Sequence, residues 1–271
     1  MFWHFVKYTG CGNDFIIFDN RSACFPLSPS LVQNLCQRQW GIGADGMVLL
    51  ENSTQADVRM RIFNADGNEA EMCGNGIRCL IHWLYSNCTY QSTYLIETAK
   101  GLLKGSFDEG NVCIDMGVPT DFKWNAPLSL DSITYLVHCL NTGVPHAVLF
   151  VSNIEEVNID RLGPMIRYHA LWQPHGINAT FAQKLNDSTI AVRTYERGVE
   201  RETLACGTGA TAAALAAAYQ FQMTAPQFVK TRSGAFLKID FVLESGIFSN
   251  VKMTGPAQRT FQGEVNLSNF S

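Results

Sequence analysis

The chain has 271 residues, of which 46% are hydrophobic and 16% charged, with a formal net charge of −4 at pH 7. This is the composition of a globular protein, and the length suits two domains with a core each. Without an excess of basic residues, neither nucleic acid nor an acidic membrane surface is expected as a partner.

The N-terminal residues lack the basic segment, apolar run and small-residue cleavage site of a signal peptide. No stretch is long and apolar enough to cross a membrane, so a cytoplasmic protein is expected. The nine cysteines are irregularly spaced and include no C-x2-C pair. This argues against a zinc site and against a dithiol redox centre. Most of the cysteines are expected to be small buried hydrophobic residues.

In chain order, the first half predicts short strands separated by Gly, Asn, Asp and Pro. A hairpin is expected around the Gly10–Asn13 turn, because runs rich in apolar and β-branched residues flank it. A helix is expected at 76–85, directly after a glycine-rich turn that begins with a cysteine, and a connection at 117–121. Strands are expected at 5–9, 14–20, 47–51, 57–64, 94–101, 101–108 and 112–117.

The second half repeats this character. A second helix, at 209–219, also follows a cysteine-led glycine turn, and nearly all of its residues are small. Such a helix allows close approach of neighbouring backbone, which favours a place inside a domain. A shorter helix is expected at 160–168. Strands are expected at 134–143, 147–153, 178–185, 189–196, 236–243 and 248–257.

The chain therefore predicts two halves built alike. The first domain is expected to span residues 1–117, joined by the C-terminal tail 251–271, and it carries Cys73. The second is expected to span residues 118–250, and it carries Cys206.

The two cysteine turns have the same form, Cys73-Gly-Asn-Gly and Cys206-Gly-Thr-Gly. Their glycines allow a ligand to approach the backbone, and the free N–H groups at the start of each helix face that ligand. The positive end of the helix favours a thiolate over a thiol, and the same N–H groups can hold a carboxylate. Two buried filler cysteines remain the ordinary alternative. That alternative is about as good as a catalytic role for one such turn, and much weaker for a pair.

A pair of such turns suits one reaction in particular. Inverting a stereocentre without a cofactor requires a base on one face of the α-carbon and an acid on the other. One thiolate would remove the α-proton while the opposite thiol delivers a proton, and donors around the carboxylate would stabilise the developing charge.

Beyond these turns, the chain resembles the diaminopimelate epimerases over nearly its whole length. The two stretches through Cys73 and Cys206 carry most of the specificity. The matching segments are residues 9–15, 41–46, 63–79, 97–98, 143–146, 178, 195–198 and 202–209.

The resemblance implies an α/β fold of two similar domains, each a barrel-like and mostly antiparallel sheet around a central helix, with the active site in the cleft between them. It implies interconversion of LL- and meso-diaminopimelate in lysine and peptidoglycan biosynthesis, without pyridoxal phosphate, another cofactor or a metal, by a homodimer. By the same resemblance, Cys73 and Cys206 are the catalytic thiols, and His146 and Glu196 tune them. The implied substrate contacts are Asn13, Asn64, Asn178, Glu196 and Arg197, and the implied backbone cradle of the α-carboxylate is Gly74, Asn75, Gly207 and Thr208.

The sequence departs from the family pattern in three places. Three residues, Val199-Glu200-Arg201, stand where the family usually has two, and they add two charges beside the Cys206 turn. Val144 replaces an asparagine that contacts substrate in many members, and Gly46 replaces a glutamine found in some. These departures lead to the hypothesis of a loosened distal pocket that accepts amino acids other than diaminopimelate.

Three other functions are also compatible with a pair of cysteine turns. A racemase of proline, hydroxyproline, glutamate or aspartate is the nearest alternative, because the proline racemases resemble the same paired-cysteine design. A cysteine hydrolase with His146 as base, and a thiol-redox protein, belong to other classes. Residues 41–46 match G-x-G-x-x-G, but a strand rather than a helix is expected after them, so a dinucleotide site is rejected.

Overall fold

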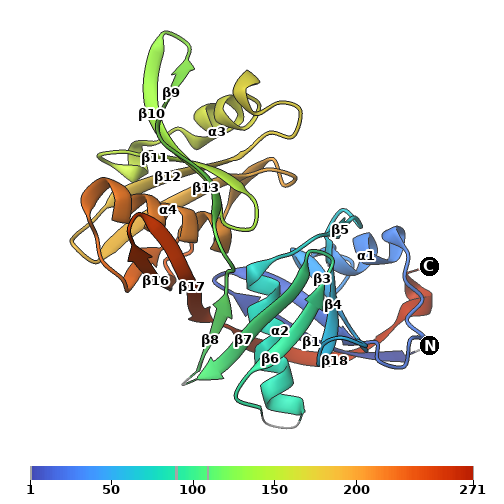
Figure 1. Cartoon of the computed structure of the whole chain (residues 1–271). Coiled ribbons are helices and arrows are strands. Elements are labelled where there is room, and N and C mark those ends of the chain that lie inside the picture. Colours follow the sequence, from blue (N-terminus) through green and yellow to red (C-terminus); the bar gives the residue numbers. More distant parts are fainter. Residues whose placement is uncertain (1, 89–90, 109, 271) are drawn as a thin grey trace. The chain divides into compact units, whose positions relative to one another are not determined.

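The computed structural model describes residues 2–88, 91–108 and 110–270 (Figure 1). The chain divides into two compact units, residues 1–114 with 255–271 and residues 115–254. Both units are rich in sheet and contain few helices, so the expected α/β class with two similar halves is confirmed.

In the first unit the strands pair in the order β18, β1, β2, β3, β4, β6, β7, β8, and β5 pairs with β4. Neighbours are antiparallel except β2–β3 and β4–β6, which are parallel. The strands are β1 (Phe2–Gly10), β2 (Asn13–Asp19), β3 (Gly46–Glu51), β4 (Val58–Asn64), β5 (Glu69–Ala70), β6 (Tyr94–Thr98), β7 (Gly101–Asp108), β8 (Asn111–Asp115) and β18 (Gln258–Asn266), and the helices are α1 (Pro29–Cys36), α2 (Gly74–Asn87) and the short η3 (Leu267–Asn269).

In the second unit the order is β9, β10, β11, β12, β13, β15, β16, β17, with β14 paired to β13. Neighbours are antiparallel except β11–β12 and β13–β15. The strands are β9 (Thr120–Leu130), β10 (Ile133–Asn141), β11 (Pro145–Phe150), β12 (Asn178–Lys184), β13 (Thr189–Glu196), β14 (Arg201–Thr203), β15 (Gln227–Lys230), β16 (Phe236–Glu244) and β17 (Ile247–Pro256), and the helices are α3 (Ile159–Arg167), α4 (Gly207–Phe221) and the short η1 (Ile154–Glu156) and η2 (Ala170–Trp172).

The two units share one plan. The succession of antiparallel and parallel pairings is the same in both, and α2 and α4 each follow the shortest strand of their unit, β5 and β14. The counterpart of β9 in the first unit is β18, which the C-terminal residues supply and which runs antiparallel to β1. The halves that the sequence predicts as alike therefore match strand by strand.

Most expected elements are confirmed, including the hairpin β1–β2 and the cysteine-led helices α2 and α4. The connection expected at 117–121 is wrong in part, because Thr120 already begins β9 and pairs with Asn141. The helix α1 was not predicted, although Ser28 caps it in the manner of a typical N-cap and Pro29 begins it.

Both cysteine-led helices are packed inside their units. Residues 207–218 of α4 are all buried, as are most residues in the first ten of α2. Small side chains on α4 allow close approach of the strands. A Cβ added to Gly209 would lie 2.9 Å from Thr194 Oγ1 and 3.2 Å from His146 Cε1. The expectation of an interior small-residue helix is thus confirmed for the second unit.

Candidate active site

Cys73 lies at the N-terminus of α2, in the extended conformation of an N-cap residue. Its carbonyl accepts the first helical bond, from the N–H of Ile77 at 3.0 Å. Its side chain does not cap the helix. Instead, the thiol donates to Asn13 Oδ1 at 3.8 Å, and Asn75 Nδ2 donates to the same oxygen at 3.2 Å. The structure therefore brings together Cys73, Asn13 and Asn75, three of the predicted site residues.

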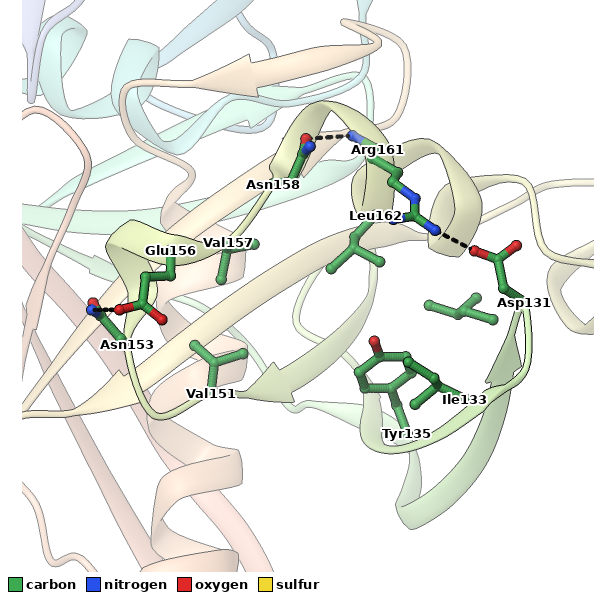
Figure 2. Close-up of a pocket in the computed structure, with 11 residues that line it drawn as sticks. Asp131, Ile133, Tyr135, Val151, Asn153, Glu156, Val157, Asn158, Arg161 and Leu162 are labelled. Atoms are coloured by element: carbon green, nitrogen blue, oxygen red, sulfur yellow. Dashed lines mark hydrogen bonds and ion pairs between the residues drawn. The ribbon is translucent and has the colours of Figure 1, made fainter.

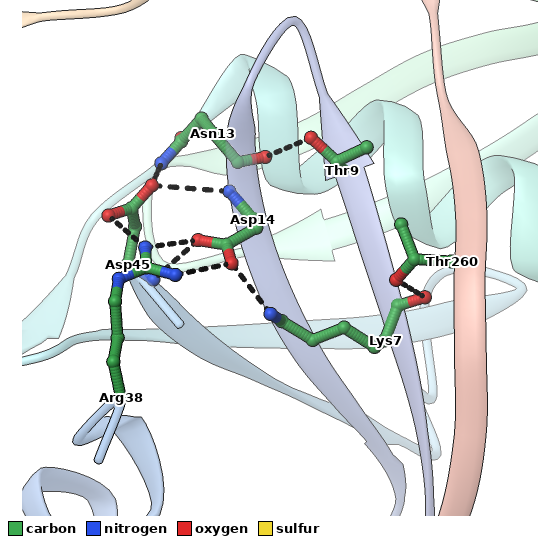
Figure 3. Close-up of polar contacts among 7 residues, drawn as sticks. All are labelled: Lys7, Thr9, Asn13, Asp14, Arg38, Asp45 and Thr260. Atoms are coloured by element: carbon green, nitrogen blue, oxygen red, sulfur yellow. Dashed lines mark hydrogen bonds and ion pairs between the residues drawn. The ribbon is translucent and has the colours of Figure 1, made fainter. Parts of the chain in front are cut away.

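A group of charged residues supports Asn13 (Figure 3). Asn13 Nδ2 donates to Asp45 Oδ2 at 3.0 Å. Arg38 binds Asp14 through both carboxylate oxygens and reaches Asp45 Oδ1 at 3.0 Å. Lys7 lies 2.6 Å from Asp14. Burial opposes ionisation of Asp14, but the bonds from Arg38 and Lys7 outweigh it and hold the pKa of this carboxyl below its usual range.

Arg78 lies beneath the Cys73 turn and is fully buried. Its Nη2 donates to Asn75 Oδ1 at 2.7 Å and to Cys11 Sγ at 3.3 Å, and its Nε donates to the carbonyl of Pro256 at 3.3 Å. A buried cation needs such a set of acceptors to offset its lost hydration. Cys11 adopts a left-handed φ of 57° in the β1–β2 turn. Burial raises the pKa of the Cys11 thiol, while the charge of Arg78 partly lowers it.

Cys206 occupies the equivalent place at the N-terminus of α4, but its side chain makes different bonds. The N–H of Gly209 donates to Cys206 Sγ at 3.4 Å, so this sulfur caps its helix. Thr208 Oγ1 lies 3.4 Å from the same sulfur. The Cys206 side chain is buried, whereas Cys73 is only half-buried.

His146 does not touch Cys206 among its described bonds, but reaches it through Thr208. His146 Nε2 lies 2.9 Å from Thr208 Oγ1, and His146 Nδ1 lies 3.0 Å from Thr180 Oγ1. Burial, and secondarily the charge of Arg197, lower the pKa of His146 to about 3. The imidazole is therefore neutral at physiological pH, with one ring nitrogen donating and the other accepting.

Glu196 ends β13 beside Cys206. Its carboxylate accepts a short hydrogen bond from the hydroxyl of Thr203. Burial raises the pKa of the Glu196 carboxyl, and bonds from Thr203 and from the Cys206 thiol offset part of this rise. A carboxyl with a raised pKa next to a thiol is suited to exchange a proton with it.

Asn178 and Arg197 are joined to one another. Asn178 Oδ1 accepts from the N–H of Arg197 at 2.7 Å, while Asn178 Nδ2 donates to the carbonyl of Pro145 at 3.1 Å. The amide thus ties the start of β11 to the end of β13. The guanidinium of Arg197 reaches the carbonyl of His175 at 3.2 Å.

Asn64 ends β4 in the first unit, opposite Gly46 of β3. The N–H of Asn64 donates to the carbonyl of Asn68 at 2.9 Å, which closes the β4–β5 turn. A Cβ at Gly46 would lie 2.6 Å from the carbonyl of Phe63, so this backbone has no room for a side chain there.

The three-residue segment beside Arg197 forms the turn between β13 and β14. Glu200 has a left-handed φ of 56°, and its carboxylate accepts from the N–H of Gly198 at 3.0 Å. Arg167 of α3 donates to Glu200 Oε1 at 2.9 Å, and only 13% of the Arg167 side chain is exposed. Burial opposes ionisation of Glu200, but the bonds from Gly198, Tyr168 and Arg167 keep its pKa below the usual value. The Glu200 carboxylate therefore ties the β13–β14 turn to α3 through Arg167.

A separate pocket of about 300 Å³ lies on the second unit among β9, β10, η1 and α3 (Figure 2). None of the predicted site residues lines it. Its charged groups already have partners: Arg161 forms an ion pair with Asp131 at 2.6 Å, and Glu156 accepts a hydrogen bond from Asn153 at 2.7 Å. None of the described cysteines lines this pocket, so it lacks the thiols that the predicted chemistry requires.

Within residues 2–88, 91–108 and 110–270, no group of three or more His, Cys, Asp or Glu side chains is placed to hold a metal ion. In the same part of the chain, no helix combines the length and the apolar character needed to span a bilayer.

Sequence reasoning missed several residues that support the Cys73 and Cys206 turns. Asp45 and Arg78 lie inside the motifs that carry the family resemblance, but their letters alone do not show that they hold Asn13 and Asn75. Thr203 also lies inside a matching segment, but its letter does not show that it binds Glu196. Thr180 carries no local signal, because it reaches His146 only through the pairing of β11 with β12.

One protein family matches most of the chain. The sequence model of the family described as Diaminopimelate epimerase matches residues 5–121 and 138–260. Proteins named diaminopimelate epimerase from Aquifex aeolicus and Methanocella arvoryzae are 37% and 38% identical to the chain, and the matches cover 97% of this chain and 97% and 96% of those proteins.

Solved structures share the fold at lower identity. A PhzF-family phenazine biosynthesis protein from Bacillus anthracis has 16% identity and a TM-score of 0.74, covering 98% of this chain and 99% of that one. A hydroxyproline epimerase from Agrobacterium vitis has 17% identity and a TM-score of 0.73, covering 97% and 92%. These likenesses concern the fold alone, whereas the family match and the closely similar sequences together show that the chain belongs to the diaminopimelate epimerase family.

Proposed function

We propose that this protein is an isomerase that interconverts LL- and meso-diaminopimelate without a cofactor. Membership of the diaminopimelate epimerase family supports the reaction class and the substrate. The observation that carries the chemistry is the pair of cysteines at the N-termini of α2 and α4, at matching positions of two units with one plan.

In the proposed reaction, Cys73 and Cys206 act on opposite faces of one α-carbon. The thiolate of one cysteine removes the α-hydrogen as a proton, and the thiol of the other gives its proton to the opposite face. The enzyme ends with the thiol and thiolate exchanged, so no proton is gained or lost overall. Inversion by this route requires only that the carbanion be stabilised while both sulfurs are in reach.

The N–H groups at the two helix starts would supply that stabilisation. They belong to Gly74 and Asn75 on α2, and to Gly207 and Thr208 on α4. An α-carboxylate held there would meet the positive ends of both helices, which favour the negative charge that develops on the carboxylate as the α-carbon loses its proton.

Glu196 and His146 would tune Cys206 in different ways. Glu196 bonds to the Cys206 thiol and has a raised pKa, so it is suited to take up and return the thiol proton. His146 is neutral and acts through Thr208, whose hydroxyl it orients toward the sulfur. Neither role requires His146 to change its charge.

The remaining predicted contacts would recognise the rest of the substrate. Arg197 offers a planar donor pair for a carboxylate, while Asn13, Asn64 and Asn178 can pair with ammonium and carboxylate groups. The Val199-Glu200-Arg201 turn, Val144 and Gly46 underlie the further proposal of a widened substrate range. Turnover of diaminopimelate compared with lysine, glutamate, aspartate, proline and hydroxyproline tests it, and activity confined to diaminopimelate would remove it.

The deciding experiment follows α-hydrogen exchange and inversion separately in deuterium oxide. The wild-type protein should incorporate deuterium at the α-carbon of diaminopimelate and equilibrate the two isomers. Cys73→Ala and Cys206→Ala should each slow inversion by about 10²-fold or more, because one face loses its acid or base. Cys113→Ala and Cys139→Ala, which replace a half-buried and a buried cysteine elsewhere, serve as matched controls. A hydrolase or a redox protein would incorporate no deuterium.

We also propose that the protein is a cytoplasmic homodimer that serves lysine and peptidoglycan biosynthesis. Its expected partner is a small amino acid rather than a nucleic acid or a membrane. Analytical ultracentrifugation would test the dimer, which predicts a particle of twice the 30.1 kDa chain mass at working concentrations.

A further inference from the structure

A chain of side-chain hydrogen bonds runs past Cys73 from a buried cation to a carboxylate. Arg78 Nη2 donates to Asn75 Oδ1 at 2.7 Å, and Asn75 Nδ2 donates to Asn13 Oδ1 at 3.2 Å. Asn13 Nδ2 then donates to Asp45 Oδ2 at 3.0 Å (Figure 3). This series of hydrogen bonds therefore begins at the Arg78 donor, passes through two amides and ends at the Asp45 acceptor.

The charged ends decide which way both amides point. A guanidinium can only donate hydrogen bonds and a carboxylate can only accept them, whereas an amide can be turned either way. Arg78 therefore requires an oxygen from Asn75, which leaves the Asn75 NH2 for Asn13. Asp45 requires the NH2 of Asn13, and is itself held by Arg38 and by the N–H of Asp14. The two ends specify the same orientation.

We infer that Asp45 and Arg78 are positioning residues that together fix the amide of Asn13, so that its carbonyl oxygen rather than its NH2 group faces the sulfur of Cys73. The inference rests on the proposed function only for its use in catalysis. The carbonyl lies 3.8 Å from Cys73 Sγ and accepts the S–H of the thiol. A thiolate would place its negative charge against that oxygen, so this arrangement favours the protonated form of Cys73.

The Cys206 turn presents different groups to its sulfur. Cys206 Sγ accepts the N–H of Gly209 at 3.4 Å, while the Cys206 thiol bonds to the carboxylate of Glu196. Cys73 thus donates to an amide carbonyl, which does not take up its proton, whereas Cys206 donates to a carboxylate, which can. In the free enzyme Cys73 is the thiol that keeps its proton for donation to the substrate.

The test is the pH dependence of Cys73 alkylation, measured peptide by peptide with iodoacetamide and mass spectrometry on the full chain without substrate. Only the thiolate reacts, so the midpoint reports the Cys73 pKa directly. Asp45→Asn should lower this midpoint by about 0.5 to 1 pH unit, the equivalent of one hydrogen bond to the thiol. Asp14→Asn is the matched control. It removes a carboxylate from the same Arg38 cluster but leaves the acceptor of the Asn13 amide in place.

A second variant, Asn13→Leu, removes the carbonyl itself and should lower the midpoint by a similar amount. It keeps the test decisive if Asp45→Asn does not fold. An equal shift in Asp45→Asn and Asp14→Asn would mean that charge alone acts on Cys73, and an unchanged midpoint in Asn13→Leu would mean that the carbonyl does not hold the thiol. Either outcome overturns the inference.

The charged and titratable neighbours that could also move this midpoint are Lys7, Asp14, Arg38, Asp45, Cys11, Arg78 and Cys79. Because alkylation needs no turnover, the test is independent of the proposed reaction. Absence of α-hydrogen exchange together with the expected shift would refute the reaction and leave the positioning role intact.

Discussion

Burial of His146 predicts a measurable change in the free energy of unfolding with pH. The ring has no exposed surface and is held between Thr180 and Thr208. Burial and the charge of Arg197 lower its pKa from 6.5 to about 3. The unfolded chain therefore binds a proton at His146 between these values, while the folded chain does not. Stability contributed by this residue is fully present above pH 6.5 and is lost as the pH falls toward 3.

The size of the effect follows from the two pKa values, 6.5 in the unfolded chain and about 3 in the folded one. Between pH 7 and pH 5, linkage gives a loss of about 2 kcal/mol in the free energy of unfolding from this residue. His146→Gln keeps a polar side chain for one of the two threonines but does not titrate. Its free energy of unfolding should therefore fall by about 2 kcal/mol less than that of the wild type over this interval.

Urea unfolding at pH 7, 6 and 5, followed by the fluorescence of Trp124 and Trp172 in the same unit, measures this difference. The comparison uses the change with pH rather than the absolute stability, because the substitution also removes a bond. A wild-type slope that matches that of His146→Gln would show that the buried ring does not resist protonation, and the neutral role proposed for it would fall.

Three further predictions concern the second unit. Glu196→Gln should reduce kcat for inversion by about 10²- to 10⁴-fold. Since Glu196 must be ionised to take the Cys206 proton and its pKa is raised, the wild-type rate should climb with pH through that pKa, and this limb should vanish in the variant. Gly209→Ala should cost about 1 to 3 kcal/mol of stability in urea unfolding, since the new methyl would lie 2.9 Å from Thr194 Oγ1. A variant as stable as the wild type would show that the strands yield to it. Glu200→Gln should cost about 1 to 2 kcal/mol through the partly buried pair with Arg167, less in 1 M salt, and a cost unaffected by salt would contradict the ionic origin.

Much of the fold follows from local pattern. Alternating apolar residues and glycine-rich turns predict most strands, and the two cysteine turns predict α2 and α4 because glycine and a free helix start are local features. The helix α1 escaped prediction although its start has local signals, whereas β9 depends on distant residues. The strand β9 contains Pro127 and alternates with few buried positions, so only its pairing with β10 defines it.

The candidate site divides in the same way. Cys73 and Cys206 can be identified from their own motifs, and so can the residues that match the family by position. The supporting residues cannot, because Arg78 is held in place by a carbonyl 178 positions away and Thr180 meets His146 only through the strand register. The domain limits expected at 117 and 250 compare with divisions at 114 and 254 in the structure.

The pairing of β1 with β18 has a consequence for synthesis on the ribosome. The first residues of the chain form an antiparallel strand pair with the last ones, from Phe2 with Asn266 to Thr9 with Gln258. Residues 115–254 are translated in full before that partner strand exists. The nascent chain can thus fold residues 115–254 first, which reverses the usual order in which N-terminal regions fold. Until β18 is synthesised, one edge of β1 stays unpaired.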